Sequence, residues 1–308
     1  MGLFYSYKKS GSGVEKDAPK KKGIALYFEI FIRKFWKLLE VNMLYSLFFI
    51  PLLLAGYAFF FMTNFYLKMI VMTVGIIAFA LVFGPATASV FKIMRSYTLE
   101  RNSFILTDFK RAFTENYKKS LAMGILNLVV FFSVYAAIRV YPIMVKAYNS
   151  KLIYIPMILC ISIGIALIFI SFYSYLLIVA TDVSFKNVIR NSIVLTIVAM
   201  KKNIISFIVT ILISAVFAVL LIFNLFTLVA LIFVPASIIM FTITFNSYPV
   251  IQKYVINPYY EQKGEKNPEL DDEDIDGEDE DEVVFEDMGG KEKPIDNTKS
   301  KNKKKRIS

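Results

Sequence analysis

The sequence contains no histidine and a single cysteine among its 308 residues. Without histidine there is no imidazole to ligate a metal, to act as a general base or to complete a Ser/His/Asp triad. One cysteine, Cys160, rules out an intrachain disulfide and a cysteine-based zinc site, and its apolar surroundings are typical of a small buried hydrophobe. A glycine-rich phosphate loop is also missing. We therefore expect no catalytic residues, no cofactor and no metal.

Charged side chains are missing from five long stretches between Val41 and Tyr248. A helix of about 20 apolar residues crosses roughly 30 Å of hydrocarbon. Hydrophobic residues make up 56% of the chain and charged residues 19%, so the composition predicts one all-α integral membrane bundle rather than separate globular domains. No small-residue cleavage site follows the first apolar stretch, which predicts a signal anchor that is retained.

The last uncharged stretch, 204–248, is too long for one crossing. As a single helix its 45 residues would extend about 68 Å, more than twice the hydrocarbon thickness, so the chain must fold back. Asn224 is the expected turn. Six transmembrane helices are therefore predicted, over 41–62, 69–91, 121–138, 153–180, 204–222 and 226–248.

Basic residues fall almost entirely on one side of these spans. With both termini on that side, it carries 31 of the 35 Lys and Arg residues, while Lys68, Arg139, Lys146 and Lys151 lie opposite. The acids between the first and last spans fall on the basic side as well. By the positive-inside rule the termini are expected to be cytoplasmic.

The two ends of the chain differ from the spans. The composition of residues 1–23 predicts a basic, flexible N-terminus. In 24–40, apolar residues recur at three- and four-residue steps, which predicts an amphipathic helix at the headgroup boundary or a simple extension of the first span. Residues 259–308 are acidic and then basic, with too little apolar area to offset chain entropy, so we expect a disordered tail.

Two charged segments on the predicted cytoplasmic side carry helix signals. In 108–120 an N-cap at Thr107 or Asp108 is followed by an apolar stripe with basic residues beside it, which predicts an amphipathic helix. Such a helix can lie on an anionic membrane surface, bind a partner helix, or simply orient the next span. In 181–203, the position of Asp182 indicates either a residue that contacts a protein partner or the N-cap residue of a short helix.

Five segments of the chain carry recognisable motifs: YFEIFIRKFWKLLEVNMLYSLFFIP at 27–51, GPATASVFKIMR at 84–95, DFKRAFTENYKKS at 108–120, and the segments 182–192 and 234–254. In this order they resemble the YesL-like family of bacterial membrane proteins. In the third, Asp108, Phe109, Phe113 and Asn116 match the Asp-Phe, Phe and Asn-Phe pattern of the family, with Tyr117 where Phe is usual.

The resemblance covers about 24–258 and implies one transmembrane domain over that range, in a bacterial cell membrane. The molecular role of the family is not established, and its genes tend to lie near carbohydrate import systems. We therefore expect a non-catalytic accessory or scaffolding component of solute uptake. Its expected partners are membrane lipids and a protein, for example a carbohydrate import system, and it is not expected to bind nucleic acid. The candidate interaction residues are Asp108, Phe109, Phe113, Asn116 and Asp182.

The alternative is a carrier or channel for a small neutral solute. An ion-coupled transporter usually keeps charged residues inside its spans, and these spans contain none. Neutral polar residues and helix-breaking prolines remain as a polar path, although such groups also serve to bond and pack neighbouring helices. The candidates for this path are Asn42, Pro51, Pro85, Thr87, Pro235 and Asn246.

Overall fold

The computed structural model describes residues 21–224 and 227–269, which form helices and the segments that connect them, with no strand among them. The predicted all-α fold is thereby confirmed. The helices are α1 (Ile24–Leu47), α2 (Ile50–Phe61), α3 (Phe65–Thr98), α4 (Ile105–Glu115), α5 (Tyr117–Tyr148), α6 (Tyr154–Ala180), α7 (Phe185–Val198), α8 (Met200–Phe223), α9 (Thr227–Phe233), α10 (Pro235–Ile251) and α11 (Asn257–Lys263). A 3-10 turn, Lys151–Ile153, precedes α6, and a π-helical turn, Gln252–Ile256, joins α10 to α11.

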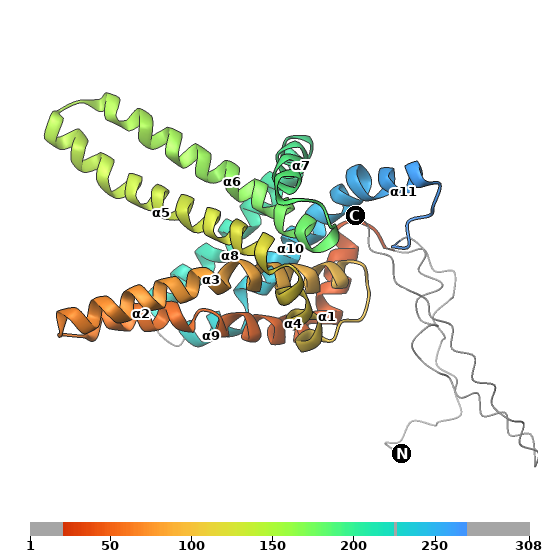
Figure 1. Ribbon diagram of the computed structural model, residues 1–308, viewed down its shortest axis with the longest axis horizontal. Coiled ribbons are helices and arrows are strands. Elements are labelled where there is room, and N and C mark those ends of the chain that lie inside the picture. The colour runs from red at the N-terminus through yellow and green to blue at the C-terminus, as the bar shows by residue number, and fades with distance from the viewer. Residues whose placement is uncertain (1–20, 225–226, 270–308) are drawn as a thin grey trace, which may run out of the picture.

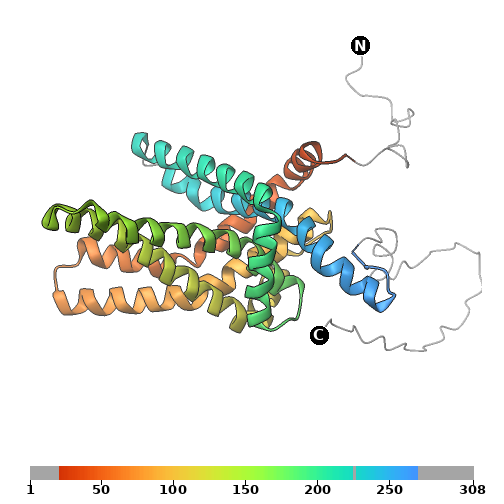
Figure 2. The same cartoon turned by 90° about the horizontal axis from the view of Figure 1, so that it is seen from above.

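Two long helical hairpins shape the molecule (Figure 1). One consists of α2 and α3, the other of α5 and α6, and their turns lie at the same end. The shorter helices α4, α7 and α11 lie at the opposite end, where Figure 2 shows α7 running crosswise to the long helices. We call this the charged end, because it contains the basic connections of the sequence.

The predicted membrane spans appear as long apolar helices. Among the described residues, five stretches are long and apolar enough to cross a membrane, namely Phe65–Thr98, Tyr117–Tyr148, Lys151–Ala180, Met200–Phe223 and Ala230–Lys263. The sixth predicted span is the pair α1 and α2, bent by 51° at its break. Large apolar side chains on these helices are exposed, for example Phe223 at 83%. Such a surface needs lipid around it, so the chain is a membrane-embedded protein.

The first span breaks between α1 and α2 for a local and a tertiary reason. Pro51 lies in the first turn of α2 and has no N–H to continue the hydrogen-bond ladder of α1. At the break, the Phe48 ring stacks on Phe109 and Phe113 of α4, with centroid distances of 5.3 and 5.6 Å. The amphipathic segment 24–40 is not a separate helix, because α1 runs through it without interruption to Leu47.

The long run 204–248 folds back as predicted. α8 ends at Phe223, and Asn224 leaves the helix with an extended backbone. The returning chain is itself broken, because α9 ends at Phe233 and α10 begins at Pro235. As at Pro51, the proline cannot donate to the preceding turn, so a second span is divided by a proline at the start of its second helix.

The predicted helix 108–120 is two helices in the structure. Its first part, α4, already begins at Ile105, and the chain leaves helical geometry at Asn116 before α5 starts. The Asn116 amide donates to the Ala112 carbonyl at 3.2 Å, and such local side-chain bonding competes with a continuous helix. The predicted N-cap at Thr107 or Asp108 was wrong, since the N-cap residue is Phe104.

The charged connection 181–203 contains a helix of its own. Ser184 is the N-cap residue of α7, so Asp182 does not hold that position. The C-terminal boundary also differs from the expectation, because α11 extends to Lys263 and the chain is described to Glu269. The predicted flexible residues 1–20 and the rest of the predicted tail, 270–308, lie outside the described residues.

Two hydrophobic clusters hold the described helices together. One surrounds α6, with residues of α3, α5, α7, α8 and α10, and includes Tyr173, Leu177 and Tyr248. The other joins α1, α3, α4 and α10 and includes Leu38, Tyr97 and Phe241. α3 and α10 contribute to both clusters, so the end of α3 is fixed where its charged residues begin.

Candidate functional site

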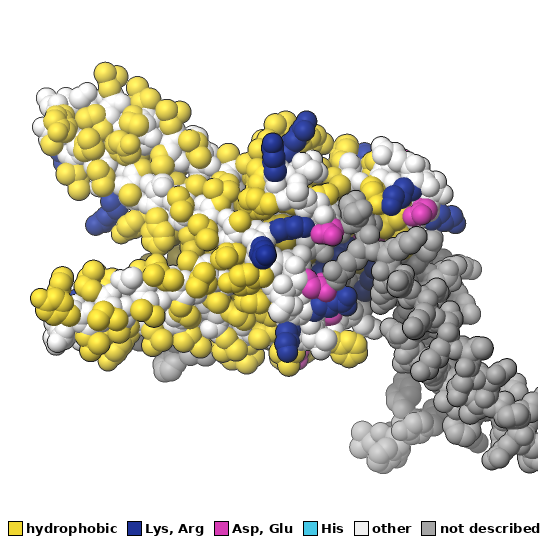
Figure 3. Space-filling view, in the orientation of Figure 1, with side chains coloured by type: hydrophobic (Ala, Val, Ile, Leu, Met, Phe, Trp, Pro, Cys, Tyr) yellow, Lys and Arg dark blue, Asp and Glu magenta, His cyan; other side chains and the backbone are white. Residues whose placement is uncertain are grey.

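On the face shown in Figure 3, carboxylates are confined to the charged end. The long hairpins on the same face are almost wholly apolar. A cavity of about 730 Å³ opens at this end. Its basic lining residues come from the end of α3, the α3–α4 connection, α4 and the start of α5: Lys92, Arg95, Arg101, Arg111 and Lys119. Its acidic lining residues are Asp108, Glu115 and Asp182.

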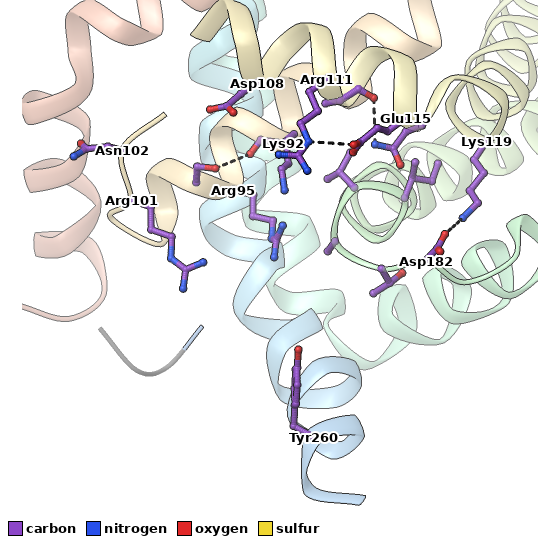
Figure 4. Close-up of a pocket in the computed structure, with 17 residues that line it drawn as sticks. Lys92, Arg95, Arg101, Asn102, Asp108, Arg111, Glu115, Lys119, Asp182 and Tyr260 are labelled. Carbon is purple, nitrogen blue, oxygen red and sulfur yellow. Dashed lines mark hydrogen bonds and ion pairs between the residues drawn. The ribbon is translucent and has the colours of Figure 1, made fainter. Parts of the chain in front are cut away.

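Each acidic residue of the cavity already has a partner nearby. Arg111 Nε donates to Glu115 at 3.1 Å, and Lys119 Nζ donates to Asp182 at 3.0 Å, as the dashed lines in Figure 4 show. Asp108 accepts the Ser103 hydroxyl at 2.6 Å and the backbone N–H of the N-cap residue of α4 at 3.0 Å. Asp108 lies in α4 and reaches back to the residues just before the helix, so it stabilises the first turn of α4.

Arg95 is the most enclosed cation of the cavity. Its Nε donates to the Tyr248 hydroxyl of α10 at 2.7 Å, and its Nη2 donates to the Glu269 carboxylate. The Tyr248 hydroxyl also donates to Glu269 at 2.6 Å, as does Gln252 Nε2 at 3.2 Å. The Arg95 and Glu269 side chains are 13% and 10% exposed. Three donors therefore converge on one nearly buried carboxylate.

Glu269 reaches Arg95 because the chain turns back after α11. Gly264 adopts a left-handed conformation with φ 69°, which suits glycine at a helix C-terminus and reverses the chain. We call 264–269 the return segment. It is tied down by the Asn267 amide, which donates to Asn257 at 2.8 Å, and by Arg101, which donates to the Pro268 carbonyl at 3.1 Å.

The environment of Glu269 favours its charged form. Burial by itself would raise the pKa of the carboxyl, but the charge of Arg95 and the hydrogen bonds from Tyr248, Gln252 and Arg95 outweigh it. The pKa of Glu269 therefore lies below its ordinary value of 4.5. At neutral pH the carboxylate is ionised and neutralises Arg95.

The predicted interaction residues are mostly engaged inside the protein. Phe109 is 4% exposed, and with Phe113 it packs against Phe48. Asp108 and Asn116 bond to backbone groups of α4 and the residues just before it. Asp182 is exposed and pairs with Lys119. The structure brings Asp108, Asn116 and Asp182 to the same cavity, whereas Phe109 and Phe113 form the contact between α4 and the break after α1.

The residues proposed for a polar path form separate contacts between helices. Asn42 bonds to the break between α9 and α10, where Pro235 begins α10. Thr87 hydrogen-bonds to Tyr45 at 2.9 Å, linking α3 to α1. Asn246 donates to Ser206 at 2.9 Å, linking α10 to α8. Pro51 lies in the first turn of α2, and Pro85 lies inside α3.

No sequence motif marks the central residues of the cavity. Lys92 and Arg95 are three residues apart at the end of a predicted span, where basic residues are expected for topology alone. Glu269 lies in the predicted disordered tail. Its only distinguishing feature in the sequence is its position as the first acid of a long acidic tract, shortly after α11 ends at Lys263. No group of three or more Cys, Asp or Glu side chains suited to hold a metal occurs within 21–224 and 227–269.

The fold and the cavity define a helical membrane protein with one charged end. Residues 38–138, about a third of the chain, match the model of a family described as protein of unknown function, DUF624. No curated protein and no solved structure matches the chain. The matched region runs from α1 into α5 and includes Lys92 and Arg95. The match is consistent with the resemblance to the YesL-like family, and it assigns no activity.

Proposed function

We propose that the chain is a non-catalytic multi-pass protein of a bacterial cell membrane that binds a protein partner at its charged end. That end faces the cytoplasm, and the chain acts there as an accessory or scaffolding component of solute uptake. The observation that carries this proposal is the concentration of charge at one end of an otherwise apolar bundle (Figure 3). The link to carbohydrate uptake rests on the family resemblance alone.

The surface available to a partner consists of exposed charges on the short helices. Lys110 on α4 and Lys186 and Arg190 on α7 are exposed. They are not needed for the internal contacts of the cavity described above. Such rim charges steer association and select a partner more than they add affinity. The partner surface is therefore expected to be acidic.

Co-purification from cells in mild detergent tests this proposal. A tagged wild-type chain is expected to recover a partner at constant stoichiometry, identified by mass spectrometry and then reconstituted from purified components. The double variant Lys186→Glu and Arg190→Glu should lose it. Lys146→Glu is the matched control, because Lys146 is an exposed cation at the opposite end, on α5. Recovery of no stoichiometric partner, or equal recovery by both variants, contradicts the proposal.

Solute flux separates the proposal from the carrier alternative. Proteoliposomes of the purified chain are expected to be as tight to neutral sugars as protein-free vesicles. Flux that is reduced by substitutions at Asn42, Thr87 and Asn246 without loss of folding would instead favour a carrier or channel.

A further inference from the structure

We propose that the cavity at the charged end is a binding site for a phosphate-bearing anion, held by Arg95, Lys92 and Arg101, and that Glu269 occupies Arg95 when the anion is absent. Arg95 and Arg101 both line the cavity and contact the return segment. Figure 4 shows their guanidinium groups extending to the same side, away from α4. The site is separate from the proposed partner surface, so each proposal stands without the other.

Arg95 is built into the protein in the manner of an anion receptor. Its side chain is 13% exposed, and a nearly buried guanidinium requires an anionic partner because its desolvation is costly. Tyr248 is 1% exposed and accepts from Arg95 Nε, which fixes the orientation of the guanidinium. The Tyr248 hydroxyl and the Gln252 amide then present donors to whatever oxygen lies beside Arg95.

The charges around Arg95 are not balanced by one carboxylate. Arg111 and Lys119 are paired with Glu115 and Asp182. Within the described residues, neither Lys92 nor Arg101 forms an ion pair. Lys92 nevertheless lies in the cavity wall one helical turn before Arg95. Asp108, whose charge acts on Lys92, and Glu269 together supply two negative charges to this group of three cations, so one positive charge is left unbalanced.

A phosphate monoester matches this group better than a carboxylate does. It carries about −1.5 to −2 charges at neutral pH and has three strong acceptor oxygens. Arginine binds such groups with two parallel N–H donors. Glu269 is thus an internal substitute with half the charge, carried on a short segment that an external anion can displace. The cavity volume of about 730 Å³ is ample for a small phosphate ester or a lipid headgroup.

Two sources of this chemistry are compatible with a cavity at the charged end of a membrane bundle. One is a soluble phosphate ester, and the other is the headgroup of an anionic phospholipid with a terminal phosphate. Both present the same oxygens to Arg95, Lys92 and Arg101. They differ in whether binding requires a lipid surface, and that difference is measurable.

The test uses the full purified chain and a reporter on the return segment. Glu265 is exposed in that segment, so an environment-sensitive dye on Glu265→Cys, in a Cys160→Ala background, reports its displacement. One arm titrates inorganic phosphate in detergent without phospholipid. The other transfers the protein into vesicles of phosphatidylcholine alone or with phosphatidic acid. A response to phosphate in detergent indicates a soluble ester, and a response only to phosphatidic acid indicates a headgroup.

Variants separate a binding site from a structural ion pair. Glu269→Gln removes the competing charge and should raise the affinity for the responding probe by about tenfold. For the variants, affinity is measured by isothermal titration calorimetry, because the return segment of Glu269→Gln is already released and the dye has no displacement to report. Adding Arg101→Gln or Lys92→Gln should lower it by at least about tenfold, while Lys146→Gln should leave it unchanged. Arg95 is left intact, so the fold keeps its buried cation. No binding of either probe by wild type and Glu269→Gln, or equal affinity of the two, overturns the proposal.

Discussion

At the residue scale, Asn42 shows how one polar side chain holds a broken helix. Its side-chain amide donates to the carbonyls of Leu231 and Ile232 at 3.1 and 2.7 Å, and its oxygen accepts the Ser237 N–H at 2.8 Å. These are the groups that a break at Pro235 leaves without partners, because the first N–H groups and last C=O groups of adjoining helices lose their ladder bonds. Asn42 is 1% exposed, so no water replaces it.

Replacing Asn42 with leucine should therefore destabilise the protein. The substitution keeps a similar side-chain volume and leaves backbone groups of α9 and α10 unsatisfied, which costs about 1–3 kcal/mol. The measurement is unfolding in detergent, followed by circular dichroism. Ser133→Ala is the control, because Ser133 is exposed and bonds only to the Val129 carbonyl of its own helix. Equal stability of the two variants would contradict the role assigned to Asn42.

Glu269 predicts a pH dependence for the return segment. Since its pKa is lowered in the folded state, the contact with Arg95 contributes stability above the ordinary pKa of 4.5 and loses it as pH falls through the lower folded value. A dye on Glu265→Cys should report release of the segment only below about pH 4.5. In Glu269→Gln this transition should be absent, and a transition that persists there would assign the pH response to another group.

At the element scale, α3 and α5 approach each other through glycine. A Cβ added to Gly84 would lie 2.1 Å from the Ser120 carbonyl oxygen, and one added to Gly124 would lie 2.5 Å from the Gly84 Cα. Small residues at such positions let membrane helices pack with their backbones in contact. This contact sets the position of α3 relative to the start of α5, and so of Arg95 relative to Lys119.

Gly84→Ala should force these helices apart and cost about 1–3 kcal/mol. Gly56→Ala is the matched control, because Gly56 lies within α2 and a Cβ there meets nothing within 4 Å. That control should be neutral or stabilising by about 0.4–1 kcal/mol, since alanine loses less backbone entropy than glycine on folding. The comparison is the unfolding midpoint of each variant in detergent. A midpoint for Gly84→Ala at or above that of Gly56→Ala would show that the contact is not tight.

The helices themselves were predictable because hydrocarbon excludes charge, so a gap in the charge pattern marks a helix. Their breaks were only partly predictable. Pro51 and Pro235 mark two of them, but the position at Phe48 also depends on rings from α4, and Asn116 divides a segment whose periodicity looks continuous. Amphipathic periodicity describes one face of a helix and does not include the tertiary contacts that end it.

The candidate site was predictable only as a charged face. Asp108, Asn116 and Asp182 were identified and line the cavity, but Arg95 and Glu269 are 174 residues apart and no local pattern connects them. The composition after Gly264 predicts disorder, because a prediction from composition counts the apolar area of a segment and does not include a single buried ion pair. Pairing across such a separation depends on the reversal at Gly264 and on the position of α10 beside α3.

At the scale of the whole molecule, charge and apolar surface divide the protein into one charged end and a lipid-exposed body. α5 has 32 residues, a rise of about 48 Å, so its two ends lie on opposite sides of roughly 30 Å of hydrocarbon. The charged end holds α4 and the start of α5, while the α5–α6 turn lies at the other end (Figure 1). The positive-inside rule predicts that the charged end faces the cytoplasm.

Thiol labelling of intact cells tests this orientation. In a Cys160→Ala background, Ala147→Cys near the α5–α6 turn should react with a membrane-impermeant maleimide added outside. Thr107→Cys on α4 should react only after permeabilisation. Both native residues are exposed, so access to the reagent differs only by the side of the membrane. Labelling of Thr107→Cys in intact cells would reverse the orientation. The charged end would then face the exterior, where a cytoplasmic phosphate ester cannot reach Arg95 and a cytoplasmic protein partner cannot reach α4 and α7.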